Sequence, residues 1–241
     1  MTQEKPTLET VLEKIRSRGH WKVIVRPERF ERERIVLSDC IKTVEECKVM
    51  LRGWDYPHVS NREPPYVGGV DYSESLTDWD GYKELWRMYQ SGQFVHFFGC
   101  REDWLGEETT LFGRSRYADT KPGSILEVIM TLYSVTEIYE FAMRMAQKKI
   151  FDDTILLSIT LNGMKDRKLT FLEAGRHLFE DYVSKIPVVE KERNVTIEDL
   201  LGKGHEMALD HTVWILERFN WTHPPRSMLK EEQEKLLTGR F

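Results

Sequence analysis

The sequence predicts an α+β fold, with a mixed, largely antiparallel sheet, flanking helices and two long aromatic-rich loops. Stretches rich in β-branched and aromatic residues alternate with stretches of helical periodicity, without the strict strand–helix–strand rhythm of a doubly wound sheet. An Asn-Gly pair between two apolar runs indicates a hairpin, and hairpins join antiparallel strands. No repeat or low-complexity tract divides the chain. We therefore expect one globular domain over 1–221 and an amphipathic helical appendage over 222–241.

The first elements are short. Thr7 is expected to cap a helix that Gly19 ends, with Thr10 in place of the glutamate of a full capping box. WKVIVRP, residues 21–27, is rich in β-branched residues and is predicted to be a strand.

A second helix and a second strand are expected next. Ser38 is predicted to cap a helix that runs to about Cys47. The following KVMLRGW is predicted to be a strand that leads into the first long loop.

The middle of the chain combines irregular stretches with apolar ones. Residues 54–79 are rich in turn formers, and residues 101–123 are also irregular. Between them, DGYKELWRMYQ is predicted to be a helix from Asp80, because its tyrosines, Leu85 and Trp86 share one helical face. QFVHFFGC, residues 93–100, has apolar residues on both faces, as a buried central strand does.

The C-terminal half contains the longest apolar region and the predicted hairpin. Residues 125–149 are expected to be mainly helical; alternatively, 125–132 form a strand before a capping box at Ser134 and Glu137. TILLSITL and KLTFL are predicted to pair as a hairpin through NGMKDR. A third strand is expected in YVSKIPVVEKERNV, then a helix from Thr196 to about Phe219, and a final helix over MLKEEQEKLL.

Composition limits the classes of function. The 241 residues are 40% hydrophobic and 31% charged, with a net charge of −5, which is typical of a globular protein and disfavours non-specific phosphate binding. Cys40, Cys47 and Cys100 lack the C-x-x-C spacing of a zinc knuckle. Cys40 and Cys47 lie seven residues apart on one face of a predicted helix and are expected to be buried thiols. The sequence shows no signal peptide and no apolar run of the ~18 residues that a membrane span requires, so a cytoplasmic protein without membrane contact is predicted.

One pattern resembles the residue order of a metal-dependent nuclease. Asp153 is followed by Asp166 and Lys168, but a simple hairpin would separate the two carboxylates by roughly 25–30 Å at about 3.3 Å per residue. Ligands of one Mg²⁺ must lie much closer together. The chain also lacks the G-x-S-x-G, G-x-x-x-x-G-K-[ST] and G-x-G-x-x-G motifs.

A second pattern, GHEMALDH, places two histidines on a predicted helix. His205 and His211 are six residues apart and face directions about 120° apart, so they cannot share one ion on a straight helix. His96 lies in an apolar strand, where a hydrogen-bonded core histidine is the usual outcome. A metal-dependent hydrolase or nuclease remains the alternative function if the fold brings dispersed side chains together; the candidates are His96, Asp153, His177, His205, Glu206, Asp210 and His211.

The leading prediction rests on aromatic residues. Twelve of the chain's Trp, Tyr and Phe residues fall within residues 54–104, and residues 71–119 carry ten acids against five bases. The acidity disfavours a nucleic-acid-binding accessory protein, which is the second alternative. We expect a non-catalytic cytoplasmic interaction module without a cofactor, which binds a protein partner or its own copy through an aromatic-rich, acidic loop surface over about residues 52–119. The predicted contact residues are Arg52, Trp54, Tyr56, His58, Arg62, Tyr66, Trp79 and Trp104.

Overall fold

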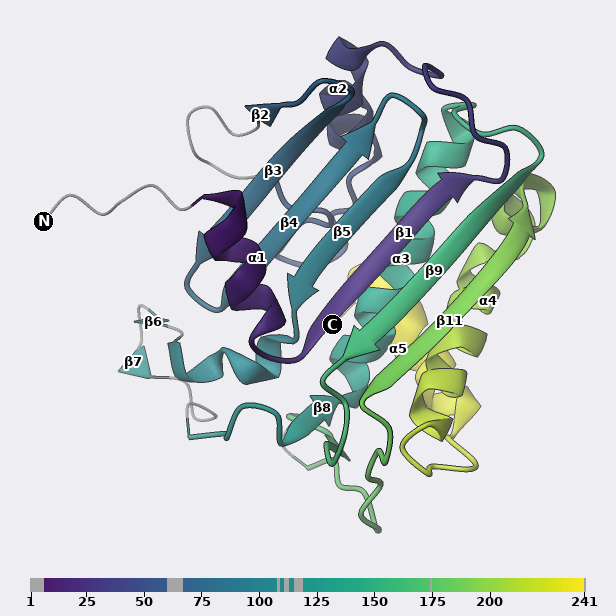
Figure 1. Ribbon diagram of the computed structural model, residues 1–241. Helices are drawn as coiled ribbons and strands as arrows, with labels where there is room; N and C mark the ends of the chain where they lie inside the picture. The colour runs from purple at the N-terminus through teal and green to yellow at the C-terminus, as the bar shows by residue number, and fades with distance from the viewer. Residues whose placement is uncertain are drawn as a thin grey trace, which may run out of the picture.

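A seven-stranded sheet forms the centre of the computed structural model, which describes residues 7–59, 67–107, 109–110, 113–114, 119–173 and 175–240. The strand order is β11-β9-β1-β5-β4-β3-β2, and every neighbouring pair is antiparallel (Figure 1). The strands are β1 (His20–Pro27), β2 (Val67–Gly68), β3 (Tyr72–Trp79), β4 (Tyr82–Tyr89), β5 (Phe94–Gly99), β9 (Thr154–Asn162) and β11 (Val188–Thr196). The predicted α+β class with an antiparallel sheet is confirmed.

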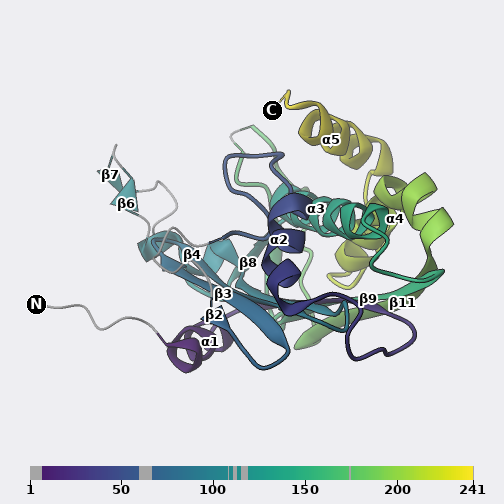
Figure 2. The same ribbon diagram turned by 90° about the horizontal axis from the view of Figure 1, so that it is seen from above.

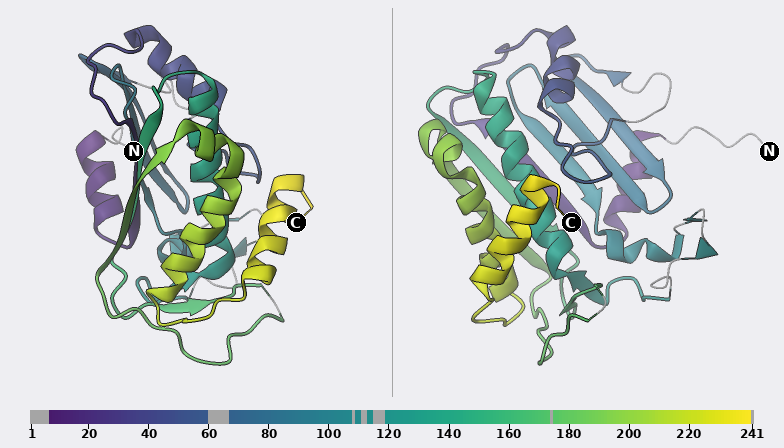
Figure 3. Two further views of the ribbon diagram at one scale, coloured as in Figure 1. Left: turned by 90° about the vertical axis from the view of Figure 1, so that its right-hand side faces the viewer. Right: turned by 180° about the vertical axis from the view of Figure 1, so that it is seen from behind.

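Helices cover the two faces of this sheet unequally. They are α1 (Leu8–Arg16), α2 (Leu37–Cys47), α3 (Val128–Gln147), α4 (Ile197–Glu217) and α5 (Arg226–Thr238). Figures 2 and 3 show α1 alone on one face and the other four helices on the opposite face. The main apolar core fills the second face, whereas on the first face Val11 and Ile15 of α1 form a small buried cluster with Leu85.

The remaining elements are short and lie at one end of the sheet. The turns η1 (Arg101–Asp103) and η2 (Leu105–Glu107) follow β5, and β6 (Thr109–Thr110) pairs with β7 (Gly113–Arg114). Strand β8 (Ile125–Glu127) leads directly into α3 and pairs in parallel with β10 (Lys168–Thr170).

The predicted helix over residues 80–90 is wrong, because this segment is strand β4. Its apolar residues serve both faces of the sheet: Leu85 packs under α1, while Trp86 and Met88 enter the main core. A strand with apolar residues on both faces also satisfies a helical spacing, so periodicity alone cannot distinguish the two. Strand β3 also lies inside the stretch 54–79 that was expected to be irregular.

The predicted hairpin over 154–172 is also wrong. Strand β9 pairs with β1 along one edge and with β11 along the other, which leaves no edge for the residues that follow. The chain turns at Gly163, where φ is 72°, and Arg167 then enters the interior to form an ion pair with Asp103. This buried pair lies against Gly19, where a Cβ atom would be 1.9 Å from Nη2 of Arg167. Residues 168–170 therefore pair with β8.

The predicted strand over 48–54 is absent, because only the bridge between Val49 and Tyr56 forms there. Each residue donates its backbone N–H to the other's carbonyl, at 2.7 and 2.9 Å. The bridge closes a short loop, so the backbone groups between its ends do not join the sheet. We call residues 48–59 the aromatic loop.

Several helix ends differ from the predictions. Thr10 bonds back to the backbone N–H of Thr7, so a capping box forms without a glutamate. Ser38 lies inside α2, whose N-cap is Val36. Strand β8 ends at Glu127, which caps α3, so the expected cap at Ser134 lies within the helix.

The predicted C-terminal helices form. Thr196 caps α4, and the two glycines of this helix do not interrupt it. Helix α5 packs against α3 and α4 and buries Leu229 and Leu236 in the main core.

Candidate functional site

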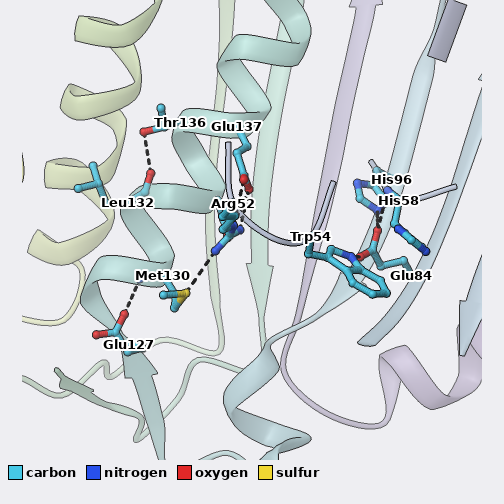
Figure 4. Close-up of polar contacts among 11 residues, drawn as sticks. Arg52, Trp54, His58, Glu84, His96, Glu127, Met130, Leu132, Thr136 and Glu137 are labelled. Carbon is cyan, nitrogen blue, oxygen red and sulfur yellow. Dashed lines mark hydrogen bonds and ion pairs between the residues drawn. The ribbon is translucent and has the colours of Figure 1, made fainter. Parts of the chain in front are cut away.

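The aromatic loop is fastened to α3 by an ion pair. Nη2 of Arg52 lies 2.6 Å from Oε2 of Glu137, and Nε lies 2.9 Å from Oε1, so the guanidinium holds both carboxylate oxygens (Figure 4). The side chain of Glu137 is only 1% exposed. Burial raises the pKa of Glu137, and Arg52 opposes that rise. Arg52 therefore neutralises a carboxylate that the core would otherwise leave unpaired.

A second anchor connects the loop to the sheet through Glu84 of β4. Trp54 donates its indole N–H to Oε1 at 2.6 Å, while Oε2 lies 3.2 Å from Nε2 of His96 and 3.3 Å from the backbone N of His58. Burial works to raise the pKa of Glu84, but the hydrogen bonds from His96 and Trp54 hold it below its ordinary value. Figure 4 shows His96 and Trp54 on opposite sides of this carboxylate. Glu84 thus stays ionised inside the fold.

The rings of the aromatic loop stack on one another and on rings of β3 and β4. Trp54 lies 3.8 Å from the ring centroids of both His58 and Tyr82, and its plane is within 3° of that of Trp79. Asp55 fixes His58 through a contact of 2.5 Å to Nδ1. Trp79 forms the outer part of this stack and is 61% exposed.

A cavity of about 370 Å³ lies between the aromatic loop, β4, β5 and the N-terminal half of α3. Its wall contains six aromatic side chains, which are Trp21, Trp54, Tyr56, Tyr82, Phe98 and Tyr133. We call it the aromatic cavity. Its size and apolar wall match those of sites that take small organic molecules.

Two residues on this wall carry a polar atom that is buried and unsatisfied. The hydroxyl of Tyr56 and Nδ1 of His96 have no hydrogen-bond partner among the described residues. Tyr56 is 6% exposed and His96 is 0% exposed. Leaving such a group unpaired costs about 1–3 kcal/mol, so each is a place where a ligand or an ordered water gains a hydrogen bond.

A second cavity, of about 600 Å³, adjoins the first. Both are lined by Arg101, Glu102, Met130 and Tyr133, so they meet beside the start of α3. The second cavity extends from there to α5.

Two buried carboxylates lie where the cavities meet. Glu102 accepts the backbone N–H of Glu127 at 2.7 Å, and Glu127 accepts those of Met130 and Leu172. Burial raises the pKa of Glu102 and raises that of Glu127 to about 7. Glu127 is therefore a candidate titrating group near neutral pH.

Some of the predicted contact residues line the aromatic cavity, and others lie outside it. Arg52, Trp54 and Tyr56 line the aromatic cavity, and His58 stacks beside it. As contact residues of a predicted loop surface, Tyr56 and His58 were expected to be exposed, but Tyr56 belongs to the main core and the side chain of His58 is largely buried.

Two other predicted contact residues lie away from the cavity wall. Trp79 is exposed, whereas Trp104 is 3% exposed and lies under Arg18, whose guanidinium carbon is 3.9 Å from the ring centroid. Trp104 is therefore a packed residue in this fold. Arg62 and Tyr66 lie outside the described residues.

The candidate metal ligands do not gather. His205 bonds to Glu140 at 2.9 Å, His211 contacts the hydroxyl of Tyr139 at 3.2 Å, and Asp210 forms an ion pair with Arg226. Across the described part of the chain, no three His, Cys, Asp or Glu side chains converge to hold a metal ion.

The other candidate metal ligands also lie apart from one another. His177 lies on the wall of a third cavity near Trp221, and His96 lies on the wall of the aromatic cavity. Asp153 precedes β9 and Asp166 follows it, so the nine-residue strand separates them by roughly 30 Å. The expected separation therefore holds although the hairpin does not form, because it depends on the length of β9.

Four glutamates on the cavity walls were not predicted as site residues: Glu84, Glu102, Glu127 and Glu137. Glu84 was placed on a helix, and Glu137 was considered only as a capping residue. One signal was available: each carries a charge inside or beside an apolar run, where charged side chains are rarely buried unless paired.

Comparison of the chain with protein-family models, with curated proteins and with solved structures found no match. Within the described ranges, none of the helices has the length and apolar content that crossing a membrane requires.

Proposed function

We propose that the protein is a non-catalytic binding module that takes a small, uncharged, planar ligand into the aromatic cavity, whose wall comes largely from region 52–119. The observation that carries this proposal is the pair of unsatisfied polar atoms, on Tyr56 and His96, within a wall of aromatic rings. Aromatic walls favour a flat ligand, because rings stack with an offset or meet edge to face.

The polar groups indicate how such a ligand would be held. Nε2 of His96 faces the carboxylate of Glu84, which can only accept, so Nε2 donates there and Nδ1 is the ring nitrogen left for a ligand. The hydroxyl of Tyr56 both donates and accepts. A heteroaromatic ring with a donor beside an acceptor, such as uracil or nicotinamide, suits this pair.

The charged groups on the wall support an uncharged ligand that is bound and not chemically changed. Glu84 accepts from Trp54 and His96, Glu137 is held by Arg52, and Glu102 accepts a backbone N–H. A charged ligand would have to displace one of these partners. The same engagement supports a binding role over a catalytic one, because no wall carboxylate among these three is left without a partner.

Tyr56→Phe is the direct test. The variant removes a buried, unsatisfied hydroxyl, so we expect its melting temperature to equal or exceed that of the wild type. Its affinity for the ligand should fall by about fivefold to tenfold, the value of one ordinary hydrogen bond. The measurement is thermal shift and heteronuclear NMR titration with uracil, nicotinamide and adenine, with cyclohexanol as a non-planar control.

Trp79→Ser is the matched control, because Trp79 touches the stack but does not line the cavity. It should leave ligand affinity unchanged within about twofold, since no hydrogen bond to the ligand is removed. The proposal fails if no planar probe gives saturable shifts at the cavity, or if Tyr56→Phe binds as tightly as the wild type.

A protein partner or a second copy, as predicted from the sequence, is a second proposal. Trp79 supports it, because an exposed tryptophan held flat by stacking is a typical hot-spot side chain. Light scattering of the wild type and Trp79→Ser tests self-association, which should weaken in the variant. A cytoplasmic location belongs to the same proposal, and the free thiols of Cys40, Cys47 and Cys100 support it.

A further inference from the structure

A second cavity of about 600 Å³ lies between the start of α3, the segment after β10, and α5. Charged and polar side chains on its wall include Arg101, Glu102, Glu127, Tyr133, Arg176 and Lys235. We infer that this cavity is an oxyanion-binding site, for a carboxylate, sulfate or phosphate group, centred on Arg176. The inference stands independently of the ligand proposed for the aromatic cavity.

Arg176 carries the inference because one end of its guanidinium is unused. Nε lies 3.0 Å from Glu173 and Nη2 lies 2.7 Å from Glu232, but Nη1 is buried and has no hydrogen-bond partner among the described residues. Guanidinium groups bind oxyanions through two parallel N–H donors, so a free buried N–H on a cavity wall fits such a ligand.

The other charges favour this cavity over its neighbour. Arg176 also borders a third cavity of about 430 Å³, but that wall is largely aromatic and aliphatic and has no other Lys or Arg among its described residues. The second cavity adds Arg101, Lys235 and Arg240. Lys235 shares the carboxylate of Glu232 with Arg176, at 2.7 Å, so an incoming anion finds two cations side by side.

The acidic residues on the wall oppose an anion only when they are ionised. Glu173 and Glu232 are already paired with Arg176. Glu102 and Glu127 are buried, and burial raises the pKa of both, to about 7 for Glu127. In the protonated form each presents no charge to the anion. Binding should therefore strengthen as pH falls through 7, where Glu127 takes up its proton.

The test is an NMR titration of the full chain with sodium sulfate, with sodium chloride holding ionic strength constant. Sulfate stays fully ionised from pH 6 to 8, so any pH dependence belongs to the protein. We expect saturable shifts around residues 172–176 and 232–235, and an affinity at least about tenfold weaker in Arg176→Gln, as loss of a charged hydrogen bond implies. Lys230→Gln removes the same charge from an exposed side chain of α5, and should bind as the wild type does.

A parallel titration with sodium acetate distinguishes a planar carboxylate from a tetrahedral anion by which of the two binds more tightly. If Arg176→Gln fails to fold, Lys235→Gln replaces it, because this side chain is 44% exposed; about threefold weaker binding is then expected. The inference is overturned if both anions give non-saturating shifts, or if the cavity variants bind as Lys230→Gln does. Tyr56→Phe should leave sulfate binding unchanged, so failure here and failure of the aromatic-cavity proposal are distinguishable.

Discussion

The two halves of the sheet differ in what covers them. Over β11, β9 and β1, helices α3 and α4 lay apolar stripes on the strands, and the buried polar residues of these strands are Ser158 and Thr160. Over β5, β4 and β3, the aromatic loop lies beside the short helix α2, which contacts β3 and β4. The buried polar or charged residues of these three strands are Ser73, Glu74, Ser75, Thr77, Lys83, Glu84 and His96. The aromatic cavity lies in this second half.

This difference explains why the cavity and most of the buried polar side chains of the sheet lie in the second half. A helix satisfies its own backbone hydrogen bonds and presents a regular stripe of side chains, which packs to high density. A loop brings irregular side-chain spacing and backbone groups that need partners. Here Arg52 pairs with the buried carboxylate of Glu137, and Trp54 bonds to that of Glu84. The space between these two contacts is not filled by side chains.

The largest expected effect comes from removing the ion pair between Arg52 and Glu137. Arg52→Met leaves Glu137 buried without its cation, which should lower the free energy of unfolding by about 3–4 kcal/mol at neutral pH. Protonation relieves an unpaired carboxylate, so the loss should shrink in acid. Urea denaturation at pH 5 and pH 8 measures both effects.

A matched surface pair controls for charge. Lys203→Met removes the cation of an exposed i,i+4 pair with Asp199 and should leave the denaturation midpoint nearly unchanged. The double variant Arg52→Met/Glu137→Gln should recover part of the loss. Equal costs for Arg52→Met and Lys203→Met would contradict the anchoring role.

The next prediction compares two side chains of α3. Leu132 is fully buried in the main core, whereas Met130 lines both cavities. Leu132→Ala should cost about 3 kcal/mol because it creates a new void, and Met130→Ala about 1 kcal/mol because it enlarges an existing one. Denaturant midpoints of the two variants give the comparison, and a larger loss for Met130→Ala would show that the cavity wall is as tightly packed as the core.

A smaller effect comes from Glu127. Its pKa of about 7 lies above the ordinary 4.5, so the folded chain keeps a proton that the unfolded chain releases, and stability falls as pH rises from about 4.5 to about 7. The wild type should lose roughly 2–3 kcal/mol relative to Glu127→Gln across this window, with no further change above it. Thermal or urea denaturation at several pH values measures the difference, and a pH-independent difference would rule out the raised pKa.

The smallest expected effect is at Trp79. Because this side chain is 61% exposed, Trp79→Ser should change the free energy of unfolding by less than about 1 kcal/mol. Calorimetry of the variant checks this. A larger loss would mean that the outer ring supports the aromatic loop and does not merely extend its stack.

The sequence alone determined the elements whose signal is local. The caps of α1 and α4, the apolar run of β5 and the β-branched residues of β1 are properties of short stretches, and each was predicted in place. The predominance of antiparallel pairing was predicted as well. The aromatic enrichment of 54–104 indicated the region where the aromatic cavity lies, without indicating a cavity.

Tertiary structure decided which strand edges pair and which charges meet. Strand β4 forms because both faces of the sheet are covered at that point, and β10 leaves β9 because both edges of β9 are occupied. Arg52 and Glu137 are 85 residues apart in sequence, and no local pattern marks them as partners. Local periodicity indicates which side of an element is apolar. The cavities depend on which strands pair and which distant side chains meet, and only the folded chain defines these contacts.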